Sequence, residues 1–68
     1  MILVGLVQES DPEAVDIRVE VYEHYGHYVR LAQRESNDSR NEDVIVMLSR
    51  EGLAELITLL NKAKGYLE

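Results

Sequence analysis

The clearest pattern in the chain is a strict alternation of apolar and polar positions over residues 17–22, Ile-Arg-Val-Glu-Val-Tyr. A period of two residues is typical of a strand that buries one of its two faces. Val29 and Leu31 continue the alternation after an interruption at residues 24–26, His-Tyr-Gly. These two segments therefore predict a β-hairpin.

The length of the turn decides which side chains face one another in this hairpin. A two-residue turn would place Val21 opposite Arg30 and mix apolar with charged side chains on one face. A three-residue loop with Gly26 in the left-handed conformation removes this conflict. It places Val21 opposite Val29 and Glu20 opposite Arg30, and cross-strand pairs of these kinds contribute about 0.2–1 kcal/mol each.

Two further segments, residues 1–7 and 44–48, contain no charged side chain. Residues 1–7 predict a strand that is covered on both faces, and residues 44–48 predict a fourth strand that is again apolar on both faces. Ser49 is a favourable helix N-cap, and it precedes apolar residues at helical spacing. These residues are Leu53, Leu56, Ile57, Leu60, Ala63 and Leu67. The sequence thus predicts a single small α+β domain over residues 1–68, with a four-stranded antiparallel sheet followed by one C-terminal amphipathic helix (ββββα).

The helix is expected to cover one face of the sheet and to leave the other face open. The open face would then carry Leu3, Tyr22, Tyr28, Ala32, Ile45 and Met47 among charged residues. An apolar patch of that size on a small domain predicts a partner surface, and we expect this face or an edge strand to form a homodimer. The candidate residues of a partner or nucleic-acid face are Arg18, Tyr22, His27, Tyr28, Arg30, Arg34, Ile45 and Met47.

Length and composition support the expectation of a dimer. A chain of 68 residues buries only about 60% of the surface that its unfolded form exposes, and it usually needs a further source of stability. Cysteine is absent, which excludes disulfides and thiolate metal sites and leaves oligomerisation. The lack of cysteine also favours a cytoplasmic protein. No apolar run approaches the roughly 20 residues of a membrane span, and no signal peptide is expected.

The formal net charge of −6 argues against a general nucleic-acid binder, because Lys and Arg drive binding to phosphate. The acidity is concentrated near the N-terminus, at Glu9, Asp11, Glu13 and Asp16, with no basic residue among residues 1–16. This acidic segment suggests a rival hypothesis. The chain would be a small acidic inhibitor, of the kind that viruses encode, that occupies a basic site on a host protein.

Few residues suggest catalysis or a bound cofactor. His24 and His27 flank the turn with Glu20 and Glu23 nearby, but they are more simply interpreted as exposed turn histidines than as zinc ligands. No serine has a base at motif spacing, and no glycine-rich phosphate loop is present. We therefore predict a non-enzymatic protein with no metal and no cofactor.

Tyr22, Tyr25 and Tyr28 lie close to Arg18, Arg30 and Arg34 along the predicted hairpin. Proteins bind single-stranded nucleic acid by such a combination of aromatic stacking and positive charge. The simpler interpretation is a solvated sheet face with cross-strand ion pairs, since the predicted register places Glu20 and Asp16 opposite two of these arginines.

The order of hairpin, polar connection, apolar strand and Ser-capped helix resembles the single-stranded-DNA-binding domain of transcriptional coactivators of the positive cofactor four type. The resemblance spans residues 17–60. It is carried by Val19, Val21, Gly26-His27, Val29, Leu31, Arg34-Glu35, Val44, Val46, Leu48, Ser49, Leu53 and Leu56. It implies a dimer that binds single strands across its sheets, with His27, Arg30 and Arg34 as candidate contacts.

The sequence departs from this family in its basic residues. His27 stands where the family has a turn lysine, and Glu42-Asp43 replaces a Lys-Gly pair before the last strand. The overall basic character is also absent. These departures argue against DNA binding more than they argue against the fold. The sequence therefore favours a homodimeric protein-interaction module, with single-stranded nucleic-acid binding and the acidic inhibitor as alternatives.

Overall fold

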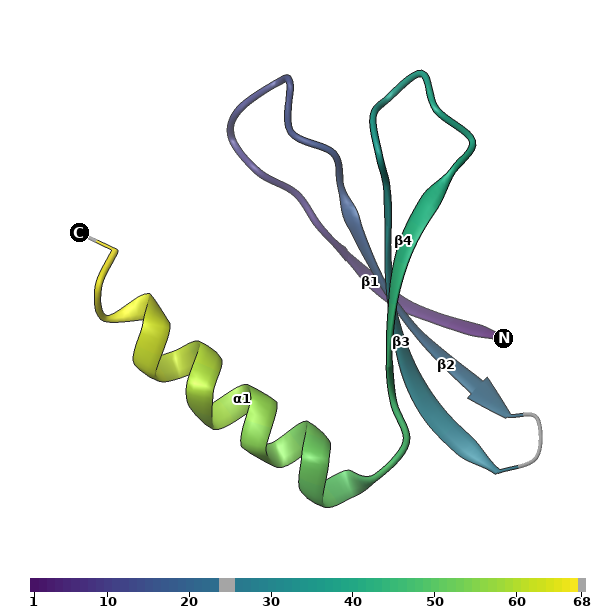
Figure 1. Ribbon diagram of the computed structural model, residues 1–68, viewed down its shortest axis with the longest axis vertical. Coiled ribbons are helices and arrows are strands. Elements are labelled where there is room, and N and C mark those ends of the chain that lie inside the picture. The colour runs from purple at the N-terminus through teal and green to yellow at the C-terminus, as the bar shows by residue number, and fades with distance from the viewer. Residues whose placement is uncertain (24–25, 68) are drawn as a thin grey trace.

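Four antiparallel strands and one C-terminal helix form the fold of the computed structural model, which describes residues 1–23 and 26–67 (Figure 1). The strands follow one another across the sheet in the order β1-β2-β3-β4. The elements are β1 (Ile2–Val7), β2 (Ile17–Glu23), β3 (His27–Arg34), β4 (Glu42–Met47) and α1 (Arg50–Lys64). This architecture confirms the predicted ββββα arrangement.

The hairpin of β2 and β3 has the register that the alternation predicts. Val21 faces Val29, Glu20 faces Arg30, and the ladder closes at Glu23 and His27. Gly26 has a φ of 108°, a conformation that side chains with a Cβ rarely adopt. His24 and Tyr25, which the turn prediction also involves, lie outside the described residues.

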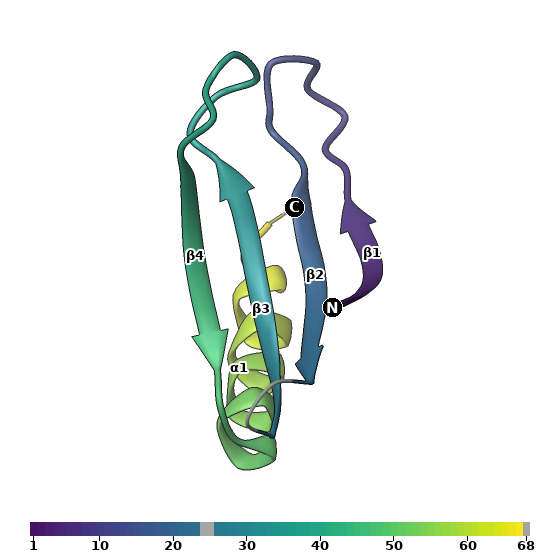
Figure 2. The ribbon, with the colours of Figure 1, turned by 90° about the vertical axis from the view of Figure 1, so that its right-hand side faces the viewer.

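Helix α1 lies on one side of the sheet but does not cover it. Figure 2 shows the helix behind the strands, and Figure 1 shows it leaving the end of β4 at a wide angle to the sheet. No residue of α1 is buried, and Ile57 and Leu60 are 51% and 57% exposed. The expectation that the helix covers one face is therefore wrong. The 15 residues of α1 are too few and too polar to cross a membrane, and the described residues contain no other helix.

Strand β1 forms one edge of the sheet, and the prediction that it is covered on both faces is also wrong. Its pairing with β2 is interrupted by an irregularity between Leu3 and Gly5. Leu3 and Leu6 lie on one face at about half exposure, and Ile2 and Val7 lie on the other face at about half exposure. An apolar run indicates a strand, but it does not supply the layers that would cover it.

Two polar loops project from the end of the sheet that is farthest from the first turn of α1 (Figure 1). Residues 8–16 join β1 to β2, and they carry the acidic residues that the sequence concentrates there. Asp11 folds this loop locally, since its side chain accepts a hydrogen bond from the Glu13 backbone N–H at 2.9 Å. Residues 35–41 join β3 to β4.

Candidate functional site

The strand register sorts the candidate residues onto two opposite faces of the sheet. One face, called here the tyrosine–arginine face, carries Arg18, Glu20, Tyr22, Tyr28, Arg30, Ala32 and Arg34. The other, called the apolar face, carries Ile17, Val19, Val21, Val29, Leu31, Ile45 and Met47. Of the eight candidates from the sequence, His27, Ile45 and Met47 lie on the apolar side, and the remaining five share the tyrosine–arginine face.

The expected grouping of Ile45 and Met47 with Tyr22 and Tyr28 is therefore incorrect. In the antiparallel pairing of β3 with β4, Leu31 faces Ile45 and Val29 faces Met47. Directly opposite residues in adjacent strands point to the same side of a sheet. The two β4 side chains thus belong with the valines and leucine of the hairpin, on the side where α1 lies.

Glu20 lies at the centre of the tyrosine–arginine face and is 1% exposed. Its carboxylate accepts a hydrogen bond from Arg30 Nη1 at 3.1 Å and another from Arg18 Nε at 3.4 Å. Arg18 also donates to the Glu42 carboxylate, which raises the pKa of the Arg18 guanidinium above its usual value. Because two carboxylates lie among these arginines, most of the positive charge of this face is compensated.

The two tyrosines of this face form a stacked pair. The rings of Tyr22 and Tyr28 have centroids 5.3 Å apart and planes inclined by 10°. The Arg30 guanidinium carbon lies 5.5 Å from the Tyr22 ring centroid, and Arg30 Nη1 donates to the Tyr22 hydroxyl at 3.3 Å. Together with the Glu20 contact, these interactions hold Arg30 in one position on the surface.

Arg34 differs from the other two arginines of the face. It is exposed, and no ion pair to it is found within residues 1–23 and 26–67. Its cross-strand neighbour in the register is Glu42, whose carboxylate instead contacts Arg18. Arg34 is therefore the arginine of this face best placed to meet an external anion.

The apolar face and the helix together leave a large apolar surface without a partner. The helix contributes a stripe formed by Leu53, Leu56, Ile57, Leu60 and Ala63, whose spacing places them on one side of α1. The helix α1 and the strands diverge from the end of β4 (Figure 1). We call the helix stripe and the apolar face together the apolar wedge.

The two faces of this sheet differ in burial in the opposite sense to an ordinary sheet domain, in which the apolar face is buried and the polar face is exposed. Among the described residues only Glu20 and Ala32 are buried, and both belong to the tyrosine–arginine face. The long side chains of that face cover its centre, whereas Ile45, on the apolar face, is 58% exposed. The centre of the tyrosine–arginine face is thus closed, whereas the apolar face is open.

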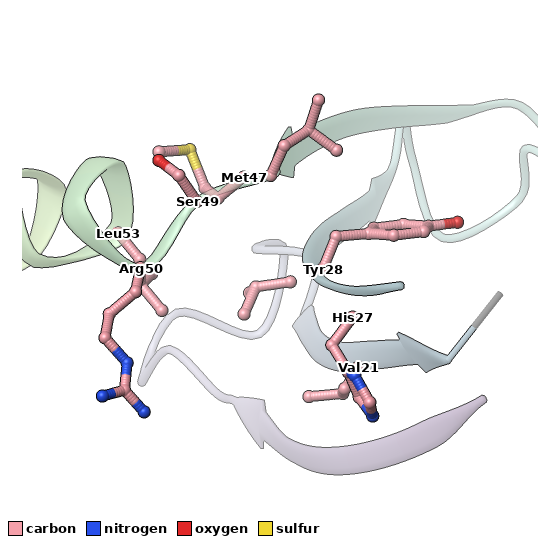
Figure 3. A pocket seen from close by; sticks show the side chains of 9 residues that line it. Val21, His27, Tyr28, Met47, Ser49, Arg50 and Leu53 are labelled. Atoms are coloured by element: carbon pink, nitrogen blue, oxygen red, sulfur yellow. The ribbon is translucent and has the colours of Figure 1, made fainter. Parts of the chain in front are cut away.

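A hollow of about 170 Å³ marks the apex of the apolar wedge. Figure 3 shows Leu53 and Arg50 of α1 on one side of this hollow and Val21 and His27 of the strands on the other. The hollow is too open and too apolar to orient a reacting group, because catalysis needs polar groups held in a sequestered site.

No family model, curated protein or solved structure matches this chain. The interpretation of its surfaces therefore depends on their own geometry and chemistry.

The turn histidine has no arrangement typical of a metal ligand. The side chain of His27 is 76% exposed, and its Nε2 lies 3.8 Å from an oxygen of Glu23, whose side chain is 52% exposed. Within the residues that the structure describes, no three His, Cys, Asp or Glu side chains form a group that could hold a metal ion. His24, the second histidine of that hypothesis, lies outside the described residues.

The helix stripe forms where its spacing predicts, but it does not have the predicted role. The spacing of Leu53, Ile57 and Leu60 was expected to cover the chain's own sheet, and the structure leaves these side chains open. The short connection is a signal that could have indicated the open helix. Only Leu48 and Ser49 separate β4 from α1, and so short a joint restricts how the helix can turn back onto its own sheet.

Proposed function

We propose that this chain is a non-enzymatic protein-interaction module that acts as a homodimer. The observation that supports the proposal is the apolar wedge, whose two surfaces are apolar, extensive and without a partner in the single chain. Surfaces of this kind mark sites of protein–protein contact. The absence of cysteine is the basis for placing this module in the cytoplasm.

The accessible surface of the chain is larger than a folded monomer of its mass should have. A monomer of 7.8 kDa is expected to expose about 4,400 Å², and this chain exposes 5875 Å². The excess is about 1,500 Å² for each chain, or about 3,000 Å² for two. Obligate dimers bury about 2,000–5,000 Å² in total, so one further copy would account for the excess.

The dimer would leave the tyrosine–arginine face free for another partner. This face lies on the side of the sheet away from α1 (Figure 2), and its centre is already closed by its own side chains. Stacked tyrosines and a positioned arginine are residue types that dominate binding energy at protein interfaces. We therefore assign self-association to the apolar wedge and partner binding to the tyrosine–arginine face.

Sedimentation velocity tests the homodimer, with Ile57→Glu as the variant. The unmodified chain should sediment at twice 7.8 kDa at micromolar concentration. Ile57→Glu should raise the dissociation constant about 100-fold or more, because an unpaired carboxylate in an apolar contact costs about 3 kcal/mol or more. Thr58→Glu adds the same charge one residue away, on the polar side of α1, and it should leave the dimer intact. A monomer at all concentrations up to about 100 µM would contradict the proposal.

A second candidate function is the binding of single-stranded nucleic acid on the tyrosine–arginine face. It is favoured by three arginines and two stacked tyrosines on one face, and by the resemblance to positive cofactor four type coactivators. It is disfavoured by the net charge of −6 and by the two carboxylates that compensate Arg18 and Arg30.

Fluorescence anisotropy with a labelled oligonucleotide distinguishes the two functions. Nucleic-acid binding predicts an affinity at about 50 mM salt that falls as salt is added, because counterions are released from phosphate. Arg34→Gln should weaken this binding, since Arg34 has no ion pair in the part of the chain that the structure describes. Arg50→Gln, at the start of α1, is the control that removes one charge elsewhere. No anisotropy change at low salt would remove this candidate.

A further inference from the structure

We infer that α1 is exchanged between two copies, so that the helix stripe of each chain covers the apolar face of its partner. The inference rests on the proposed homodimer and specifies how its two subunits meet. Three features of the chain lead to it: where the helix touches its own sheet, how it is joined to β4, and on which side of the sheet it projects.

The helix lies against its own sheet at its N-terminal end. A Cβ on Gly52 would lie 3.4 Å from Cε of Met47, so the helix starts in close contact with the end of β4. Leu53 and Leu56 are half-buried, and exposure then rises to 51% at Ile57 and 57% at Leu60. The part of the stripe farther from the joint therefore stays exposed and is not covered by the rest of residues 1–23 and 26–67.

The joint between β4 and α1 holds the helix in this direction. Only Leu48 and Ser49 connect the two elements, and Ser49 has extended backbone angles of −128° and 150°. The Ser49 hydroxyl accepts a hydrogen bond from the Gly52 N–H at 3.0 Å, and its carbonyl accepts one from Leu53 at 3.1 Å. Folding the helix down onto its own sheet would require a change in this capped two-residue joint, and short joints of this kind favour exchange between copies.

The apolar face cannot be covered without meeting a helix. Because α1 and the apolar face lie on the same side of the sheet, two apolar faces that approach each other must enclose both helices (Figures 1 and 2). The length of the helix is similar to the length of the strand that it would cover. The 15 residues of α1 extend over about 22 Å, and the eight residues of β3 extend over about 26 Å.

Two-fold exchange also covers both surfaces of the apolar wedge in each chain. Each chain offers one helix stripe and one apolar face, and each receives the complementary surface of its partner. Such an isologous contact is closed, so association stops at two copies. A foreign apolar helix could cover the sheet of one chain, but it would leave the stripe of α1 exposed. A second copy covers both surfaces.

Engineered cysteines test the exchange, since the chain contains no cysteine of its own. Leu60→Cys on the stripe and Leu31→Cys on the apolar face are made on separate chains, one of them tagged, then mixed by refolding together and oxidised. We expect a disulfide between the two chains in at least fivefold greater yield than for Thr58→Cys with Leu31→Cys. Thr58 lies on the opposite side of α1 and is the matched control.

A chain that carries both Leu31→Cys and Leu60→Cys, refolded with a large excess of the cysteine-free chain, should form no internal disulfide. An internal disulfide would show that the helix closes on its own sheet and would overturn the exchange. A stable dimer without the expected disulfide between chains would also overturn it, while the homodimer itself would stand. A monomer would instead contradict the proposed function. Where either variant loses its circular dichroism signal, Ala63→Cys and Val19→Cys replace the pair and are judged by the same outcomes.

Discussion

Glu20 is the largest fully buried side chain described in the molecule, although it is charged and lies on the polar face of the sheet. Its burial results from its neighbours, since Arg18 and Arg30 lie over it and donate to its two oxygens. A buried carboxylate is stable only when such partners satisfy it. The centre of the tyrosine–arginine face is therefore held together by one acidic residue between two arginines.

Replacement of Glu20 by Gln should lower the free energy of unfolding by about 1–3 kcal/mol, because it removes the charge from two hydrogen bonds and leaves Arg30 without a carboxylate partner among the described residues, whereas Arg18 keeps Glu42. Urea denaturation followed by circular dichroism, at a fixed protein concentration, measures the change. Glu35→Gln is the control, since Glu35 is exposed and no ion pair to it is found among the described residues. Equal stability of the two variants would show that the buried network contributes nothing.

At the scale of elements, the β2–β3 hairpin is the part that the sequence specifies best. The alternation of residues 17–22 and the position of Gly26 were sufficient to fix which residues face one another, including Tyr22 with Tyr28. Register follows from the pattern because a slip of one residue would move every apolar side chain to the other face. Gly26 is the residue that makes the three-residue loop possible.

Gly26→Ala should therefore destabilise the fold by about 1–2 kcal/mol, since a Cβ is strained at a φ of 108°. The strain is conformational, because open space surrounds the position. Gly5→Ala is the matched control. Gly5 also has open space around it but is not at positive φ, so this change should be neutral or slightly stabilising. Thermal melts of the two variants provide the comparison, and equal losses would contradict the role of Gly26.

Two other elements could not be placed from the sequence. Residues 35–41 are polar and contain no periodicity, so nothing in them sets how β4 aligns with β3, and Ile45 and Met47 were assigned to the wrong face. The helix was predicted correctly in position, type and cap. The packing of the helix was not predicted correctly. An apolar stripe indicates that one side of a helix is covered, but it does not indicate whether the chain itself or another molecule covers it.

At the scale of the whole molecule, the sheet and the helix do not make a closed core in one chain. Only one apolar residue among those described is buried, Ala32, which is too little to offset the conformational entropy of 68 residues. If two copies supply the missing core, folding and association are one process, and stability depends on protein concentration.

The thermal midpoint should accordingly rise by several degrees between about 2 and 200 µM chain, because mass action favours the associated state. Differential scanning calorimetry at both concentrations measures the shift. Two chains joined in tandem by a flexible linker should lose most of this dependence, since association is then intramolecular. A midpoint that does not move with the concentration of the unlinked chain would indicate a monomer that is stable by itself.

The two-residue joint at Leu48 and Ser49 has a consequence for how this protein could change during evolution. Because its shortness directs the helix outward, a small insertion at this point would give the helix the freedom to turn back onto its own strands. The number of subunits in the assembly would then be encoded by the length of one connection, with no alteration of any side chain on the contacting surfaces. Descendants of the same sequence could thus become self-sufficient monomers through insertion alone.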